Sequence, residues 1–262
     1  MWYTLLICFL AGLGAGLGTG LAGLSAAVVV SPMLIVFLGF PAYKAVGIAL
    51  ASDVLASAAS AVSYGKKKNL DIKNGLVMMA AILVFTFVGS FFAKYVPNKA
   101  MSTISVFWTL VLGIKFIIRP VNTTRQEMET VSKKKRLIES IAFGAAIGLV
   151  CGFIGAGGGM MMLLILTTVL GYELKTAIGT SVFIMAFTAL TGAVTHFAVS
   201  GFPDWKILVC CSLSTLLWAK VAAYFANKVD NKILNRIIGI VLCVLGVAMS
   251  IVYVLFRLKS HE

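Results

Sequence analysis

Long runs of uncharged, mostly apolar residues recur along the whole chain and constrain its fold more than any other feature. They cover residues 1–43, 74–93, 140–172, 176–203 and 237–256. A membrane-spanning helix needs about 20 apolar residues, because the hydrocarbon core of a bilayer is about 30 Å thick. Hydrophobic residues make up 60% of the chain and charged residues 12%, against about 45–50% and about 25% in soluble domains. We therefore predict an all-α integral membrane protein.

The formal net charge of +13 fits the same interpretation. Lys and Arg residues lie mainly in short segments between apolar runs, as the positive-inside rule describes, so we expect membrane lipid around the protein and no nucleic-acid partner. No positive residue precedes the first apolar run and no signal-peptide cleavage pattern follows it, so this helix is expected to stay in the mature protein. The predicted location is the cell membrane, as a multi-pass protein.

Few residues offer metal-binding, redox or catalytic chemistry. The five cysteines lie inside apolar runs without metal-ligand or redox spacing, and buried thiols behave as small hydrophobic side chains. We therefore predict no metal and no cofactor. Two histidines supply too few groups for a convergent catalytic set, and no P-loop motif is present. The sequence thus predicts neither an enzyme nor direct ATP drive.

The two halves of the chain repeat one plan. When the second half is aligned on the first, Asp204 falls on Asp71, and a neighbouring register places Gly144, Gly148, Gly152, Gly171 and Gly179 on Gly12, Gly16, Gly20, Gly39 and Gly47. Such self-similarity indicates internal structural repeats. We predict a first transmembrane repeat over residues 1–119, a basic cytoplasmic linker over 120–136 and a second transmembrane repeat over 137–262.

Each half offers five apolar segments, about ten in all. They cover residues 3–24, 25–40, 42–64, 74–95 and 99–118, then 137–155, 157–171, 174–200, 205–226 and 232–256. The second and seventh segments are short or broken, nearer to re-entrant helices than to full spans.

The charges of matching loops bear on the topology. Residues 66–68 are all lysine, while the corresponding loop at 200–203 carries no charge. An odd number of crossings per half inverts the second half relative to the first and explains this difference. We predict two inverted five-segment repeats in a polytopic helix bundle, with both termini outside. Eight crossings, with the short segments dipping in and out, is the alternative left open.

Two glycine patterns have different interpretations. Glycine at every fourth residue, as in Gly12, Gly16 and Gly20, favours close helix packing in membranes. The three successive glycines of residues 157–159 instead cost helix stability, about 1 kcal/mol each relative to alanine. A helix break exposes backbone N–H groups at the positive end of the next helix, which favours an anion. The second pattern therefore predicts an anion site, with tight helix crossing as the alternative.

Asp53 is an acidic residue well inside a predicted span. A carboxylate at the centre of a membrane helix costs about 2.5–3.5 kcal/mol on insertion scales, so a function or a paired partner is expected. We predict that Asp53 couples proton movement to anion movement, with permanent pairing to Lys220 as the alternative. Lys220 can also extend to the interface, and His196 either titrates near neutral pH or serves as an interfacial hydrogen-bonding residue.

The stretch 148–159, followed by Gly171-Tyr172 and by Ala177-Ile178-Gly179-Thr180-Ser181, resembles the sulfite exporter TauE/SafE family of membrane permeases. The resemblance covers both halves. It implies a secondary transporter for small sulfur-containing anions such as sulfite, sulfonates or related organic anions. The first half departs from the family pattern, because Gly23-Leu24-Ser25 replaces the glycine cluster and Ile48-Ala49 replaces the Thr-Ser pair.

We expect the small anionic substrate to bind between the two helix breaks, with proton coupling through Asp53. The predicted substrate-binding residues are Gly20, Gly23, Ser25, Ser52, Gly155, Gly157, Gly158, Gly159, Thr180 and Ser181. A passive anion channel and a transporter of other small carboxylate-type anions remain alternatives. The exact anion, the direction of transport and the coupling ion stay open, and an oligomer is allowed but not implied.

Overall fold

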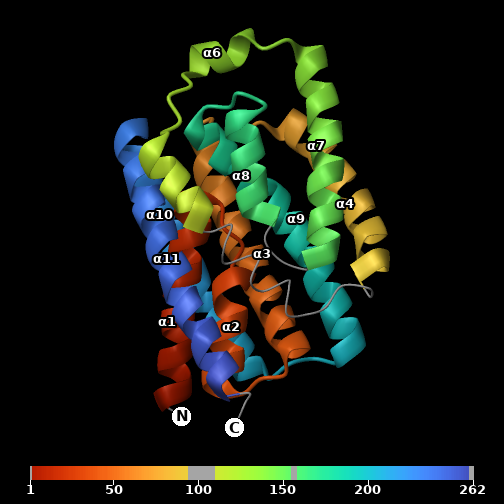
Figure 1. The fold of residues 1–262 in the computed structure, drawn as a ribbon, viewed down its shortest axis with the longest axis vertical. Coiled ribbons are helices and arrows are strands. Elements are labelled where there is room, and N and C mark those ends of the chain that lie inside the picture. The colour runs from red at the N-terminus through yellow and green to blue at the C-terminus, as the bar shows by residue number, and fades with distance from the viewer. Residues whose placement is uncertain (1, 94–109, 155–157, 260–262) are drawn as a thin grey trace.

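The computed structural model describes residues 2–93, 110–154 and 158–259, and these residues form a bundle of helices (Figure 1). The first half contains α1 (Trp2–Ala22), α2 (Ala27–Leu38), α3 (Ala42–Lys66), α4 (Ile72–Ala93) and a helical stretch over residues 110–118. The second half contains α7 (Lys133–Ile154), α8 (Gly158–Thr168), α9 (Leu174–Ser200), α10 (Trp205–Lys228) and α11 (Asn231–Lys259). No strand occurs among the described residues.

Five of the described helices are long and apolar enough to cross a membrane, namely α1, α3, α9, α10 and α11. Their outward faces carry large apolar side chains such as Val62, Val194 and Val244, each more than half exposed. A monomeric soluble protein rarely exposes such a surface, whereas lipid solvates it. The expected all-α, multi-pass membrane protein is thus confirmed.

The helices α2 and α8 are too short to span, as predicted. They contain 12 and 11 residues, which correspond to about 18 and 16 Å of helix. A corresponding left-handed glycine follows each helix, Gly39 at φ 66° directly after α2 and Gly171 at φ 64° three residues after the last residue of α8. The following residues, Phe40 and Tyr172, donate back to carbonyls of the last turn, the hydrogen-bond pattern of a glycine C-cap.

Glycine faces join the two halves. A Cβ added at Gly16 of α1 would lie 2.6 Å from the Thr215 carbonyl oxygen of α10, and one at Gly148 of α7 would lie 2.9 Å from the Phe85 Cβ of α4. Helix backbones approach this closely only where no side chain intervenes. The packing role predicted for the four-residue glycine pattern is therefore confirmed.

The two glycine contacts correspond to each other residue by residue. Gly12 faces Ser214 and Gly16 faces Thr215 and Trp218, while Gly144 faces Ala81 and Gly148 faces Ile82 and Phe85. The alignment of the halves that pairs Asp71 with Asp204 also pairs Ala81, Ile82 and Phe85 with Ser214, Thr215 and Trp218. The first helix of each half thus packs in the same register against the fourth helix of the other half.

The linker and the chain ends lie at opposite ends of the bundle. Both ends of the chain lie together, and the linker helix α6 (Arg125–Thr130) lies at the far end (Figure 1). Asn235 of α11 fixes the linker by accepting from the Val121 amide and donating to the Val121 carbonyl, at 2.8 and 3.0 Å. α7 begins at Lys133, before the predicted start of the second repeat at residue 137, because the lysine-rich run continues the helix.

We predict that Gly16→Ala lowers the free energy of unfolding by about 1–3 kcal/mol, since its Cβ would meet backbone atoms of α10. Gly65→Ala is the matched control, because its Cβ would lie 3.4 Å from a flexible atom of Leu70. Thermal unfolding of both purified variants in detergent measures the difference. Equal midpoints would contradict the close contact between α1 and α10.

Candidate functional site

The helix break of the first half meets the start of the short helix of the second half. Gly23, at φ 62°, lies in the break between α1 and α2. A Cβ at Gly159 of α8 would collide with the Gly23 carbonyl oxygen, and one at Gly23 would collide with the Ser181 hydroxyl of α9. These three residues therefore meet. Gly155 and Gly157 lie outside the described residues.

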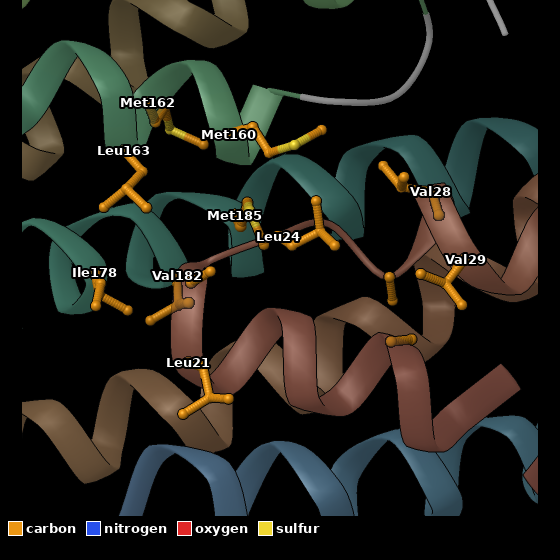
Figure 2. Close-up of a cluster of buried hydrophobic side chains, with 14 of the residues drawn as sticks. Leu21, Leu24, Val28, Val29, Met160, Met162, Leu163, Ile178, Val182 and Met185 are labelled. Atoms are coloured by element: carbon orange, nitrogen blue, oxygen red, sulfur yellow. The ribbon is translucent and has the colours of Figure 1, made fainter. Parts of the chain in front are cut away.

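Apolar side chains surround this meeting point. In Figure 2, Leu24 of the break lies beside Met185 of α9, with Met160 of α8 close by. Leu24, Met160 and Met185 are all buried. Polar contacts here must therefore come from the backbone of the breaks and from a small number of side chains.

Asp53 of α3 is the buried charged group next to the break. Its side chain is 1% exposed, and it accepts hydrogen bonds from Ser25 at 2.7 Å and from Ser57 at 2.9 Å. Because α2 begins at Ala27, the carboxyl group lies at the positive end of that helix, which stabilises its charged form.

The second half places a different side chain at the corresponding position. The alignment that pairs Gly12 with Gly144 also pairs Asp53 with Met185 and Ala27 with Gly159. The Met185 sulfur indeed lies against Gly159, near the start of α8. The start of α2 is thus occupied by a carboxyl group of the protein, whereas a neutral thioether lies beside the start of α8.

Several predicted site residues lie elsewhere. Thr180 accepts from the Asp71 amide at 3.1 Å, at the start of α4. Ser52 donates to the Ile48 carbonyl and lies 3.2 Å from the Ser212 hydroxyl of α10. Gly20 packs against α10. These residues join helices together, because their polar atoms or close contacts are taken up by neighbours.

Neither of the two additional candidates contacts Asp53. Lys220 is exposed on α10. Among the described residues, the Asp53 carboxyl group accepts from the side chains of Ser25 and Ser57, so the suggested Asp53–Lys220 pair does not form. The Nδ1 atom of His196 lies 3.0 Å from the Tyr43 carbonyl oxygen, where α9 approaches the start of α3. His196 therefore belongs to the periphery of the bundle.

Ser57 is a site residue that the sequence analysis missed. It lies one helical turn after Asp53 on α3 and donates to its Oδ1 atom. Residues four apart share a helix face, so a serine at this spacing from a buried aspartate was the signal that could have identified it.

Comparisons with known proteins agree with this architecture. The family model described as "Sulfite exporter TauE/SafE" matches residues 8–249. The "Probable membrane transporter protein YunE" of Bacillus subtilis (strain 168) is 26% identical over 90% of this chain and 93% of its own length. The "Probable membrane transporter protein YdhB" of the same organism is 23% identical over 94% of this chain and 98% of its own length. The "Probable membrane transporter protein ORF9" of Sinorhizobium sp. is 23% identical over 95% of this chain and 93% of its own length.

We predict that Ser57→Ala lowers the free energy of unfolding by about 1 kcal/mol, because it removes a buried donor to a carboxyl group. Ser63→Ala is the control on the same helix, since its hydroxyl donates only to the Ala59 carbonyl one turn earlier. Denaturant titration in detergent micelles distinguishes the two. If both variants lower the free energy of unfolding equally, the hydrogen bond from Ser57 to Asp53 makes no specific contribution to stability.

Proposed function

This chain belongs to the sulfite exporter TauE/SafE family, and from that premise we propose that it is a secondary transporter of small sulfur-containing anions. It is a multi-pass membrane transporter, and its family and relatives indicate transport rather than enzymatic catalysis. The proposed substrates are sulfite, sulfonates and related organic anions, and the proposed location is the cell membrane. The observation that carries the proposal is the contact between the break that separates α1 from α2 and the start of α8, beside a buried carboxyl group.

We place the transported anion at the start of α8, beside Gly23 and Ser181. The first amides of a helix lack intrahelical acceptors and lie at its positive end, so they bind anions well. Discontinuous helices of this kind hold substrates in many transporters with inverted repeats. At the start of α2 the Asp53 carboxyl group already occupies the equivalent position, whereas Met185 beside α8 brings no competing charge.

Asp53 supplies the coupling to protons in this proposal. An ionised carboxylate about 4 Å from a bound monoanion is repelled by about 4 kcal/mol at an effective dielectric constant near 20. Protonation removes that repulsion, so anion binding and proton binding favour each other. A neutral carboxyl group carries a donor of its own, so Ser25 or Ser57 then accepts where both now donate.

We also propose that the two repeats are inverted. The linker helix α6 lies at the end of the bundle opposite to both chain ends (Figure 1), which supports an odd number of crossings in each half. The matched register of the α1–α10 and α4–α7 contacts supports a common plan for the halves. Such pairs of inverted repeats allow alternating access to a site between them.

We predict that purified protein in liposomes accumulates sulfite when a pH gradient is imposed. Asp53→Asn mimics the protonated carboxyl group, so it should keep exchange between equal sulfite pools and lose pH-driven accumulation. Asp204→Asn is the control, because Asp204 is exposed at the start of α10. Flux of sulfite, thiosulfate, taurine and small carboxylates is measured in parallel.

Each outcome of this experiment bears on one part of the proposal. Dissipation of a sulfite gradient without accumulation would establish the passive channel. Unchanged accumulation in Asp53→Asn would exclude Asp53 from coupling. Accumulation of small carboxylates, with no flux of sulfite or sulfonates, would overturn the substrate class and leave the transporter mechanism intact.

The inverted topology predicts that the loops after α3 and α9 lie on opposite sides of the membrane. Single cysteines at Lys67 and Phe202, both exposed, are introduced into a background in which the five native cysteines are replaced. We expect an impermeant maleimide to label one site from outside intact cells and the other only after the membrane is opened. Labelling of both from the same side would establish the eight-crossing alternative.

A further inference from the structure

A second group of polar side chains lies at the end of the bundle that carries α6. Asp71 precedes α4, and its carboxylate accepts from the Asn74 amide at 3.1 Å and from the Asn74 side chain at 2.7 Å. The Tyr172 hydroxyl, from the segment between α8 and α9, also donates to it at 2.8 Å. Tyr172 is fully buried, so the cluster joins two helices from different halves.

Arg136 of α7 completes this cluster and keeps unused donor capacity. Its side chain is 10% exposed. One terminal nitrogen donates to the Met128 carbonyl of α6, and the other lies 4.0 Å from Asp71. The guanidinium group also lies over the Tyr172 ring, 5.1 Å from its centroid. The Nε atom is buried without a hydrogen-bond partner among the described residues.

Ser140 lies one turn further along α7 and also has a buried polar atom without a hydrogen-bond partner among the described residues. It is 1% exposed, and its hydroxyl has no partner among the residues that the structure describes. Buried polar groups are nearly always hydrogen-bonded, and an unpaired one calls for an unseen acceptor. Two such donors, one helical turn apart, lie on one helix face.

The packing of α7 shows what this face meets. Gly144 and Gly148 continue the row of Arg136 and Ser140, and they lie against Met78 and Ile82 of α4. Arg136 and Ser140 therefore lie beside the beginning of α4, where the helix dipole adds positive potential.

Glu139, which lies between Arg136 and Ser140 in the sequence of α7, carries a negative charge that would repel an anion. Its Oε1 atom lies 3.8 Å from the Lys135 ammonium group, and its Oε2 atom is buried without a partner among the described residues. Lys135 offsets the charge of Glu139. A water shared by Glu139 and Arg136 is the competing explanation for the unpaired atoms.

We propose that Arg136 and Ser140 bind the transported oxyanion at the α6 end of the bundle, at a site separate from the two helix breaks. The inference rests on the proposed anion transport. A guanidinium group can donate two parallel hydrogen bonds to two oxygens of one oxyanion, whereas an ammonium group acts as a point charge. The corresponding positions of the first half carry no such pair, because the alignment that pairs Gly144 with Gly12 pairs Arg136 with Thr4 and Ser140 with Cys8. The site therefore acts on one side of the membrane only.

The test measures KM for sulfite separately from each side, in right-side-out and inside-out vesicles. Arg136→Gln should raise the KM on the α6 side about 10-fold and Ser140→Ala about 3-fold, with the KM on the other side unchanged. Arg136→Lys should give an intermediate value, since it keeps the charge and loses the planar fork. Arg125→Gln is the matched control, because Arg125 is an exposed arginine on α6 that pairs with Glu129.

Two further results distinguish the proposed site from a purely structural role of Arg136, and its failure from a failure of the proposed transport function. Equal KM changes on both sides, or a change only in folded yield, would overturn the site and assign Arg136 to tying α6 onto α4. Sulfite-induced thermal stabilisation in detergent is independent of transport. Stabilisation that falls by half or more in Ser140→Ala but not in Arg125→Gln supports the site even if no flux is found. Unchanged stabilisation in Ser140→Ala, together with an unchanged KM on the α6 side, overturns the site and leaves the proposed function standing.

Discussion

Lipid offers no hydrogen bonds, so every backbone group at a helix break must find a partner within the protein. The break between α1 and α2 meets this condition locally. The Thr19 hydroxyl donates to the Leu24 carbonyl at 2.7 Å, and the Gly23 and Leu24 amides donate back to the last turn of α1. Asp53 and Ser25 complete the start of α2. The buried carboxyl group is thus part of what makes a break tolerable at this depth.

The two halves differ in the side chain that lies at the start of the short helix. A common plan places one short helix in each half, yet Asp53 lies at the start of α2 and Met185 lies beside the start of α8. A carboxyl group can gain or lose a proton, and a thioether cannot. If the breaks bind and couple as proposed, the first half responds to protons while the second half holds the anion. Divergence between repeats then supplies the coupling.

Much of the architecture follows from periodicity in the sequence, whereas the partners of polar residues do not. The glycines at every fourth position and the two short segments predicted close packing and interrupted helices, because both depend on local spacing. Thr180 bonds to the Asp71 amide, and Lys220 faces outward rather than toward Asp53. Such contacts depend on how α4, α9 and α10 are rotated about their axes, which apolar runs do not specify. Ser57 could have been predicted from the sequence, because a residue four positions after Asp53 shares its helix face.

Carboxylates of the chain itself lie at the starts of several helices, and two of them are shielded from the surface: Asp53 at α2 is buried, and Asp71 at α4 is partly buried. Both are held by neutral donors, from Ser25 and Ser57 in one case and from Asn74 and Tyr172 in the other. Neutral donors stabilise a carboxylate less firmly than a close ion pair, and the Arg136 guanidinium group stands 4.0 Å from Asp71. In the proposed mechanism, an anion that reaches the start of α2 meets donors already arranged for negative oxygen. The Asp53 carboxylate must first be protonated or displaced, because two negative groups this close repel each other. Proton binding and anion binding at this helix start are then interdependent.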